Sequence, residues 1–389
     1  MNIISSISRD SQKTIISLIY PAKSEWLKAN DLEKQLSLFS VKKNIIMKAM
    51  MLTGIRAIEM REVPDPKLQN PGDVKIKMLA LGVCGSDIHY YTDGKIGSQV
   101  VQYPFTVGHE GAGVVIETGS AVTRVKKGDI VAIDPAMPCW TCDQCKAGRH
   151  HTCRKLKFLG CPGQAEGCLS EFIVMPQESC FALHHGMTSD QAAISEPLSI
   201  GVYAVRRSIP MQGARVGILG YGPIGMSVML AARAMGAETF YVTDKIEERL
   251  KMARQEGVAW AGHAEDNVVK AIKEREPLGL DVVFECCGQQ EAVDQAIEIA
   301  KPGGKIMIVG IPEFDRWSMD VDDTRRKEIT FQFVRRQVDC VQESLDLIHE
   351  GKIKIDRMIT HRFSFAQARE AFDLVAGYED GVMKAMIDF

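Results

Sequence analysis

The feature that most constrains the fold is a glycine-rich turn, GYGPIG, between a predicted strand and a predicted helix. Residues 215–219 (RVGIL) form an apolar strand, and residues 226–235 (MSVMLAARAM) form a helix directly after the turn. The spacing G-x-G-x-x-G in this context is typical of a βαβ unit that binds a dinucleotide. The motif therefore predicts a parallel sheet covered by helices, with a phosphate-binding turn at one edge.

Each residue of the turn has a physical role in this interpretation. Gly220 permits the tight turn, Gly222 lets the backbone approach a pyrophosphate, and Gly225 allows the helix to pack closely on the strand. Pro223 and Ile224 complete the loop, and the free N–H groups of the helix N-terminus face the phosphates. We expect all five residues to contact the cofactor.

The acidic residue Asp244 ends the next predicted strand. Its carboxylate is placed to accept hydrogen bonds from the adenosine ribose hydroxyls, and it would repel a 2′-phosphate, which favours NAD over NADP. Arg249 follows one helical turn later. It either contacts the ribose edge or is a solvated surface charge, and the sequence leaves both readings open.

Apolar strands alternate with helical stretches from residue 200 to residue 332, as in ETFYVTD, EERLKMARQEG and KIMIVGI. This alternation predicts a doubly wound parallel sheet, that is, a Rossmann coenzyme domain. Residues 47–199 instead contain short strands separated by Gly, Pro and Asp, which indicates a β-rich domain. Residues 333–389 are too short for a core of their own, and we expect them, with the closing strand KAMIDF, to complete that domain.

Residues 1–46 differ from the rest of the chain because they are rich in Ser and Lys and lack a continuous apolar segment. They do not have the apolar core and small-residue cleavage site of a secretory signal. We interpret them as an N-terminal appendage of unknown role.

Four of the eleven cysteines lie within fifteen residues, at Cys139, Cys142, Cys145 and Cys153. Four thiolates in one loop match a closed tetrahedral zinc site, which is structural. This arrangement favours a reducing compartment, so we expect a cytoplasmic protein. Two further cysteines, Cys286 and Cys287, are predicted to be small buried residues within a strand.

A second group of metal-binding residue types is dispersed along the chain. Cys84 lies in GVCGSDIH, His109 and Glu110 lie in VGHEGAG, and Glu196 lies in SEPLS. A thiolate, an imidazole and carboxylates can bind zinc and leave one position open for water or substrate. Only the fold can bring these residues together, and their spacing alone does not prove it.

The net charge of −3 provides no field suited to a nucleic acid or an anionic membrane. No apolar run reaches the roughly 18 residues needed to span a bilayer. We therefore expect neither nucleic acid nor a membrane as a partner.

The motifs GVCGSDIHYY, GHEGAGVV, SEPLS and GYGPIG, with the four-cysteine lobe, resemble the medium-chain zinc-dependent alcohol dehydrogenases. Within that family they resemble the sorbitol (L-iditol/xylitol) dehydrogenase branch, and the resemblance covers residues 47–389. It implies a GroES-like β-rich catalytic domain, a Rossmann coenzyme domain, and a homodimer or homotetramer. It also implies the cofactors NAD and zinc, with one catalytic and one structural ion per chain.

The resemblance also implies residue roles. Cys84, His109 and Glu110 correspond to the ligands of the catalytic zinc, while Glu196 would touch the metal through water and bind substrate. Ser86 and His89 correspond to a proton relay, and Tyr90 corresponds to a substrate contact. The end of the strand beside the nicotinamide corresponds to Val309, Gly310 and Ile311. The branch also places an arginine on the substrate near Arg335 and Arg336, but the flanking Val334 and Gln337 depart from its pattern.

The function that these observations favour is oxidation of a secondary alcohol of a polyol to a ketone with NAD. Alternatives within the family are L-threonine, 2,3-butanediol and sugar-acid dehydrogenases, which share the zinc and NAD apparatus. An alternative of another class is a non-catalytic NAD-binding protein. The presence of the full set of predicted zinc ligands and relay residues argues against it: Cys84, His109, Glu110, Ser86 and His89.

Overall fold

The computed structural model describes residues 46–389, so the appendage predicted for residues 1–46 lies outside the described residues except for Ile46. The first strand begins at Ile46, one residue before the expected start of the strand pattern. Within residues 46–389, no helix combines the length and the apolar character needed to cross a bilayer.

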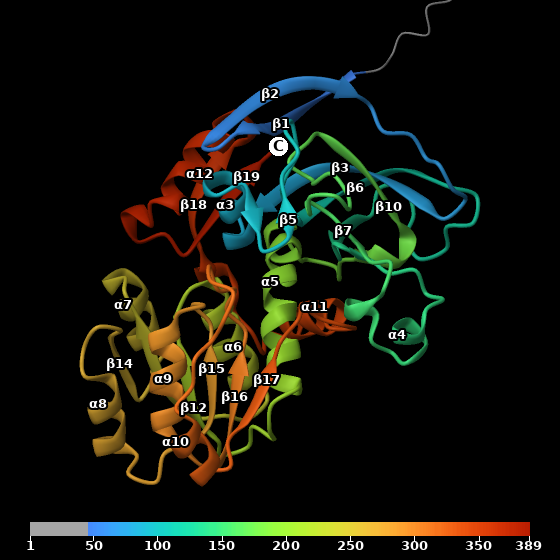
Figure 1. Cartoon of the computed structure of the whole chain (residues 1–389). Coiled ribbons are helices and arrows are strands. Elements are labelled where there is room, and N and C mark those ends of the chain that lie inside the picture. The colour runs from blue at the N-terminus through green and yellow to red at the C-terminus, as the bar shows by residue number, and fades with distance from the viewer. Residues whose placement is uncertain (1–45) are drawn as a thin grey trace, which may run out of the picture. The chain divides into compact units, whose positions relative to one another are not determined.

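The N-terminal part is built from β-strands, as expected. A hairpin of β1 (Ile46–Gly54) and β2 (Ala57–Pro64) precedes a seven-stranded sheet in the order β11-β7-β6-β3-β19-β18, with β10 paired to β3. Its strands are β3 (Asp73–Gly82), β6 (Glu110–Thr118), β7 (Ile130–Ile133), β10 (Phe172–Pro176), β11 (Cys180–Ala182), β18 (Ile359–Ser364) and β19 (Lys384–Asp388). The C-terminal strand β19 runs antiparallel to β3, with Ile387 opposite Leu81. Figure 1 shows this red strand beside the blue and cyan strands.

Short elements occupy the loops of this sheet. They are α3 (Gly85–Thr92), β4 (Lys95–Ile96), β5 (Gln99–Val100), β8 (Ala136–Met137), α4 (Asp143–Lys146) and β9 (Lys157–Phe158). The first helix, α3, directly follows β3, and α4 lies in the four-cysteine lobe.

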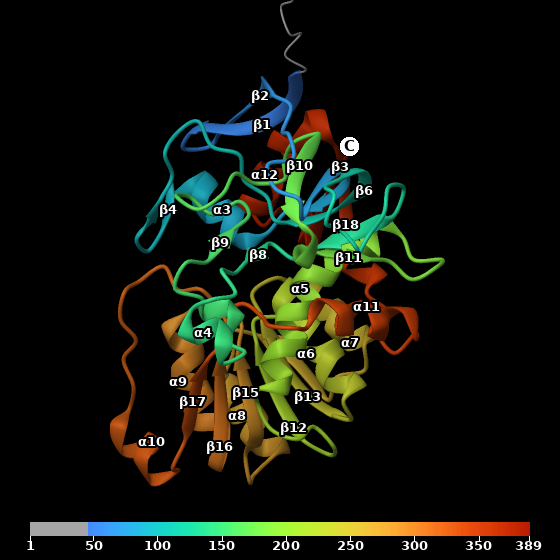
Figure 2. The same ribbon diagram turned by 90° about the vertical axis from the view of Figure 1, so that its right-hand side faces the viewer.

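The coenzyme part is a six-stranded parallel sheet in the order β14-β13-β12-β15-β16-β17. The strand order reverses at β12, which is the switch point where doubly wound sheets bind ligands. The strands are β12 (Arg215–Leu219), β13 (Thr239–Asp244), β14 (Trp260–His263), β15 (Leu280–Glu285), β16 (Ala300–Ile308) and β17 (Thr330–Phe333). The helices are α6 (Pro223–Ala234), α7 (Glu247–Gln255), α8 (Val268–Arg275), α9 (Gln290–Ile299) and α10 (Val321–Arg326), and Figure 2 shows several of them against the sheet. The predicted doubly wound sheet is confirmed.

Two local predictions need correction. Helix α6 begins at Pro223, three residues earlier than expected, because a proline at the first helical position has no N–H to leave unpaired. Cys286 and Cys287 follow β15 and do not lie within a strand, and Cys287 is exposed. The strand ends at the buried Glu285, whose carboxylate accepts the N–H groups of Cys287 and Gly288 and turns the chain.

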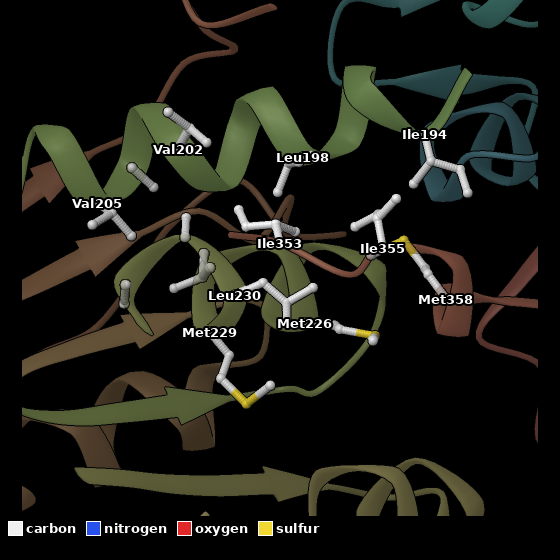
Figure 3. Packing of buried hydrophobic residues seen from close by; sticks show 14 of the residues in the cluster. Ile194, Leu198, Val202, Val205, Met226, Met229, Leu230, Ile353, Ile355 and Met358 are labelled. Atoms are coloured by element: carbon white, nitrogen blue, oxygen red, sulfur yellow. The ribbon is translucent and has the colours of Figure 1, made fainter. Parts of the chain in front are cut away.

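The helix α5 (Ser189–Arg206) connects the two parts and packs on α6. A side chain at Gly201 would lie 2.5 Å from the backbone of Ser227, so glycine is required for this close approach. Figure 3 shows the apolar side chains that face each other here: Ile194, Leu198, Val202 and Val205 of α5, Met226, Met229 and Leu230 of α6, and Ile353, Ile355 and Met358. The same core includes Ala80 and Met386 of the β-rich sheet.

Two helices complete the C-terminal segment. Val341 and Leu345 of α11 (Val341–His349) belong to the core shared with α5 and α6. Phe372 of α12 (Ala368–Ala376) belongs to the separate core of the β-rich sheet, where its ring lies edge-on to Tyr91.

Candidate active site and zinc sites

The dispersed cysteine, histidine and glutamate meet at the end of β3. Cys84 lies between β3 and α3, and His109 and Glu110 stand at the start of β6. Because β6 pairs with β3 and places Glu110 opposite Gly82, the three side chains converge. Their ligand atoms lie within 4.8 Å of one another. One sulfur, one nitrogen and one carboxylate oxygen at this separation fit an open, catalytic zinc site.

The imidazole of His109 is oriented by Asp87, a residue whose role the sequence analysis missed. Asp87 is fully buried, and its Oδ1 lies 3.3 Å from His109 Nδ1 and accepts the N–H of Gly108 at 3.2 Å. Burial alone would lower the pKa of His109, but Asp87 and then Cys84 raise it well above its usual value. Because the carboxylate contacts Nδ1, Nε2 is free to bind a metal. A carboxylate on the second ring nitrogen is common for a zinc-bound histidine.

Glu110 forms a buried ion pair with Lys384, which the sequence analysis also missed. Both residues are almost completely buried, and Lys384 Nζ donates to the two carboxylate oxygens of Glu110 at 2.8 and 2.7 Å. The same ammonium donates to the carbonyl of Val83 at 3.2 Å. Although burial opposes it, Glu110 raises the pKa of Lys384, so the amine stays charged. The Glu110 carboxylate therefore lies at the metal position and is also paired with the charged Lys384 side chain.

Glu196 of α5 is buried beside this cluster. Burial raises its pKa to about 7, an effect that His109 opposes and Glu110 reinforces. It does not belong to the close group formed by Cys84, His109 and Glu110. A carboxyl group with a pKa near neutrality can hold or release a proton at physiological pH.

The predicted proton relay residues lie together on α3. Ser86 Oγ donates to Cys84 Sγ at 3.4 Å, and His89 stands three residues further, on the same side of the helix. His89 Nδ1 lies 3.6 Å from Asp93 Oδ2, and its side chain is one quarter exposed. The helix thus connects the metal position with a partly exposed imidazole.

Tyr90 belongs to a polar group that sequence reasoning found only in part. Its hydroxyl donates to Gln99 Oε1 at 3.2 Å and lies 3.8 Å from Cys161 Sγ, while Gln99 Nε2 lies 2.8 Å from the same sulfur. The guanidinium of Arg336 lies over the ring of Phe158, 3.5 Å from its centre. Gln99 and Cys161 carried no sequence signal, because each is an isolated polar residue in a loop.

The four cysteines of the lobe converge as predicted. Cys142 Sγ lies 3.6 Å from Cys145 Sγ and 3.8 Å from Cys153 Sγ, and all four sulfurs lie within 4.8 Å of one another. Tetrahedral zinc with bonds of about 2.3 Å requires sulfur–sulfur separations of about 3.8 Å. All eleven cysteines are free thiols, so disulfides do not compete for these sulfurs.

The glycine turn has the geometry that a dinucleotide site needs. Gly220 has a φ of +96°, and a side chain at Gly225 would lie 2.0 Å from the carbonyl oxygen of Gly220. Gly222 caps the N-terminus of α6, and a side chain there would meet only Arg249 Nη1, at 3.4 Å. Pro223 and Ile224 form the first turn of α6.

Asp244 ends β13 and is buried against the glycine turn. Its Oδ2 accepts the N–H of Tyr221 at 2.7 Å, and its Oδ1 accepts the N–H of Ile246 at 2.9 Å. Each carboxylate oxygen keeps a second lone pair for a ribose hydroxyl. Arg249 is not the solvated surface charge that the sequence allowed. It is 7% exposed and donates to the carbonyl of Val382 at 3.0 and 2.6 Å.

Val309, Gly310 and Ile311 follow β16 at the carboxyl edge of the sheet. The N–H groups of Val309 and Gly310 donate to the carbonyl of Glu285, and a side chain at Gly310 would lie 2.2 Å from the N–H of Gly288. This edge is where doubly wound sheets hold their ligands.

Comparisons with known proteins agree with this geometry. The family described as "Alcohol dehydrogenase GroES-like domain" matches residues 70–185, and "Zinc-binding dehydrogenase" matches residues 223–350. A sorbitol dehydrogenase of Bacillus subtilis is 33% identical over 343 residues, which cover 88% of this chain and 97% of that protein. An L-idonate 5-dehydrogenase of Vitis vinifera is 33% identical over 84% of this chain and 91% of its own length.

A solved structure shows the same fold. The crystal structure of 2R,3R-butanediol dehydrogenase from Bacillus subtilis has a TM-score of 0.79 and 30% sequence identity, and the match covers 88% of this chain and 99% of that chain. By its two matching domains and its relatives, the chain belongs to the zinc-binding dehydrogenases with an alcohol dehydrogenase GroES-like domain.

Proposed function

We propose that the protein oxidises a secondary alcohol of a polyol or sugar alcohol to a ketone with NAD. The observation that carries the proposal is the convergence of Cys84, His109 and Glu110 beside the relay helix that bears Ser86 and His89. Relatives named sorbitol dehydrogenase support a polyol as substrate. A buried, charged cluster carries a desolvation penalty, which we do not expect in a protein without catalytic activity.

Each zinc-site residue has a separate task in this mechanism. Cys84, His109 and Glu110 would hold the catalytic zinc. Zinc lowers the pKa of bound water from 15.7 to about 7, and it would lower the pKa of a bound alcohol in the same way. Ser86 would accept the alcohol proton and His89 would pass it toward solvent. Glu196 would contact the metal through water and bind the substrate. Cys139, Cys142, Cys145 and Cys153 would hold the structural zinc.

The cofactor would lie across the glycine turn, with its pyrophosphate at the N-terminus of α6. Asp244 would bind the adenosine ribose, and its charge would exclude a 2′-phosphate. Val309, Gly310 and Ile311 would lie beside the nicotinamide, which accepts the hydride. Arg249 would stabilise this edge, since its Nη1 lies 4.0 Å from Asp244 Oδ2.

We also propose domain boundaries near residues 199 and 332, with residues 333–389 completing the catalytic domain. A homodimer or homotetramer is expected from the family resemblance. The eleven free thiols stay reduced most readily in the cytoplasm, where we place the protein.

The test is NADH formation by zinc-loaded protein with a panel of sorbitol, xylitol, L-iditol, galactitol, L-threonine, 2,3-butanediol and ethanol, with NAD and NADP in parallel. NADH from a sugar alcohol supports the proposal. Activity only with threonine or butanediol would keep the mechanism and exclude the substrate class.

A further inference from the structure

We propose that the substrate carries an oxyanion, either a phosphate ester or a carboxylate, which binds in a cavity next to the catalytic centre. The cavity has a volume of about 280 Å³ and lies between the four-cysteine lobe and the loop after β17, with Arg335 and Arg336 in its wall. The inference rests on the proposed polyol dehydrogenase function and narrows its substrate class.

Arg336 is a half-buried cation that no carboxylate of the described chain neutralises. Arg336 Nη1 is buried without a hydrogen-bond partner, and no carboxylate of residues 46–389 lies within ion-pair distance of the guanidinium. Burial and the charge of Arg335 lower the pKa of Arg336 only to about 10, so the cation persists at neutral pH. The ring of Phe158 contacts one face of the guanidinium, but a buried N–H without an acceptor is unfavourable, and an anionic ligand would supply that acceptor.

The backbone presents this side chain from a strained and braced loop. Arg336 has a φ of +54°, a left-handed conformation that is unfavourable for a residue with a side chain. The next residue braces the loop, because Gln337 Nε2 donates to Asp134 Oδ2 at 2.9 Å and Gln337 Oε1 accepts the N–H of Cys340 at 3.0 Å. The loop therefore holds a strained arginine in place before ligand arrives.

Neutral groups of the cavity wall also lack partners. His151 is 6% exposed and lines the cavity, and its Nδ1 is buried without a hydrogen bond. Its Nε2 lies 3.1 Å from the Tyr203 hydroxyl, so when that hydroxyl donates, Nδ1 carries the proton. Gln164 in the same wall also has a buried side-chain oxygen without a partner, and rotation of its amide would present N–H groups instead.

The charges of the wall favour an anion over a neutral hydroxyl. Arg154 also lines the cavity, but Asp143 neutralises it with two hydrogen bonds of 2.6 and 2.8 Å. Arg335 is exposed and forms no ion pair with any described residue. Two unpaired guanidinium groups match the planar, bidentate geometry of a phosphate or carboxylate.

The cavity is close enough to the metal position for one substrate to reach both. The ring of Phe158 lies 5.5 Å from the ring of His109 and 3.5 Å from the Arg336 guanidinium carbon. A substrate with its reacting hydroxyl at the metal would therefore carry the anion a few bonds further along its chain.

The experiment compares a neutral polyol with its charged forms on the zinc-loaded full chain. Sorbitol, sorbitol 6-phosphate and gluconate are assayed for NADH formation. Charge-assisted hydrogen bonds predict a kcat/KM about 10- to 100-fold higher for a charged form. The better of the two anions identifies phosphate or carboxylate as the source of the charge.

Two variants test the cavity itself. Arg336→Gln should bring the ratio of kcat/KM for the charged substrate to kcat/KM for the neutral substrate close to one. Arg335→Gln should also lower this ratio, and it serves as the test if Arg336→Gln does not fold. Arg326→Gln is the matched control, because Arg326 is exposed and paired with Asp322 on α10. Its ratio should equal that of the unmodified protein.

Binding of inorganic phosphate gives a readout that does not need turnover. Phosphate should raise the Tm of the unmodified protein and of Arg326→Gln, but not that of Arg336→Gln. Equal kcat/KM for neutral and charged polyols, without a phosphate effect on Tm, would overturn this inference and leave the proposed function intact. Absence of NADH from every polyol, with zinc and NAD bound, would instead overturn the proposed function.

Discussion

The ion pair of Glu110 and Lys384 places two opposite charges in the interior next to a metal position. Each charge has lost its hydration, and the pair is tolerated because Lys384 contacts both carboxylate oxygens of Glu110 and a backbone carbonyl. Removal of one partner leaves the other charge without compensation, which is the costly case for buried pairs.

We therefore expect Lys384→Met to lower the free energy of unfolding of the zinc-free protein by about 3–5 kcal/mol. The loss should be smaller with zinc bound, since the metal supplies a cation to Glu110. Denaturant unfolding with and without zinc measures both values. The control Lys352→Met removes an exposed pair with Glu350 and should change stability by less than about 1 kcal/mol. An equally small effect for Lys384→Met would contradict the role of the pair.

Glu196 should make stability depend on pH. Its pKa rises from 4.5 to about 7 on folding, because it is buried. Between these pH values the native state keeps a proton that the unfolded chain releases, so the free energy of unfolding falls as the pH rises. The fall is about 3 kcal/mol at 1.36 kcal/mol per unit. Chemical denaturation of zinc-free protein at several pH values should show a shallower slope for Glu196→Gln, and an unchanged slope would exclude a raised pKa.

Cys84 is expected to be needed for one zinc ion and for turnover. In Cys84→Ser the zinc content should fall from two ions to one per chain, because the hydroxyl replaces the thiolate ligand. NADH formation should be lost, while NAD affinity should stay close to that of the unmodified protein. Elemental analysis and NAD titration measure these effects. Two retained zinc ions with full activity would remove Cys84 from the catalytic site.

At the scale of elements, the four-cysteine lobe contributes no residue between 139 and 153 to the hydrophobic clusters of the described chain, so we expect its stability to depend on its metal. Cys142→Ser should lower Tm by several degrees, since metal binding to such a loop contributes folding free energy. The protein that remains folded should keep most of its kcat. Calorimetry and assays below the transition separate these effects, and full stability with lost activity would show that the lobe acts in the chemistry.

The elements that local sequence specifies were predicted well. The strand Arg215–Leu219, the turn with Gly220 at positive φ, and Asp244 at the end of β13 all occur as expected. Turn chemistry and periodicity are local properties, so one segment suffices to predict them. The partners Asp87 and Lys384 were missed, because their importance depends on contacts with Gly108 and Glu110, which lie 21 and 274 residues away.

At the scale of the whole described unit, the sequence predicted two kinds of sheet but not how they share a core. Helix α5 provides apolar residues such as Leu198 to a cluster that contains Ala80 of one sheet and Val216 of the other. Alanine and valine are ordinary residues in any strand, so nothing in the sequence marks this contact. The loop of Arg336 also depends on this packing, since Gln337 is held by Asp134 of the β-rich part.

The most direct test of the account is NADH formation from a sugar alcohol before and after removal of zinc. Zinc-loaded protein with NAD and the polyol panel should form NADH, zinc-free protein should not, and re-addition of zinc should restore the rate. NADH formation that persists in protein shown to be zinc-free, or a zinc- and NAD-bound protein that oxidises no sugar alcohol, would contradict it.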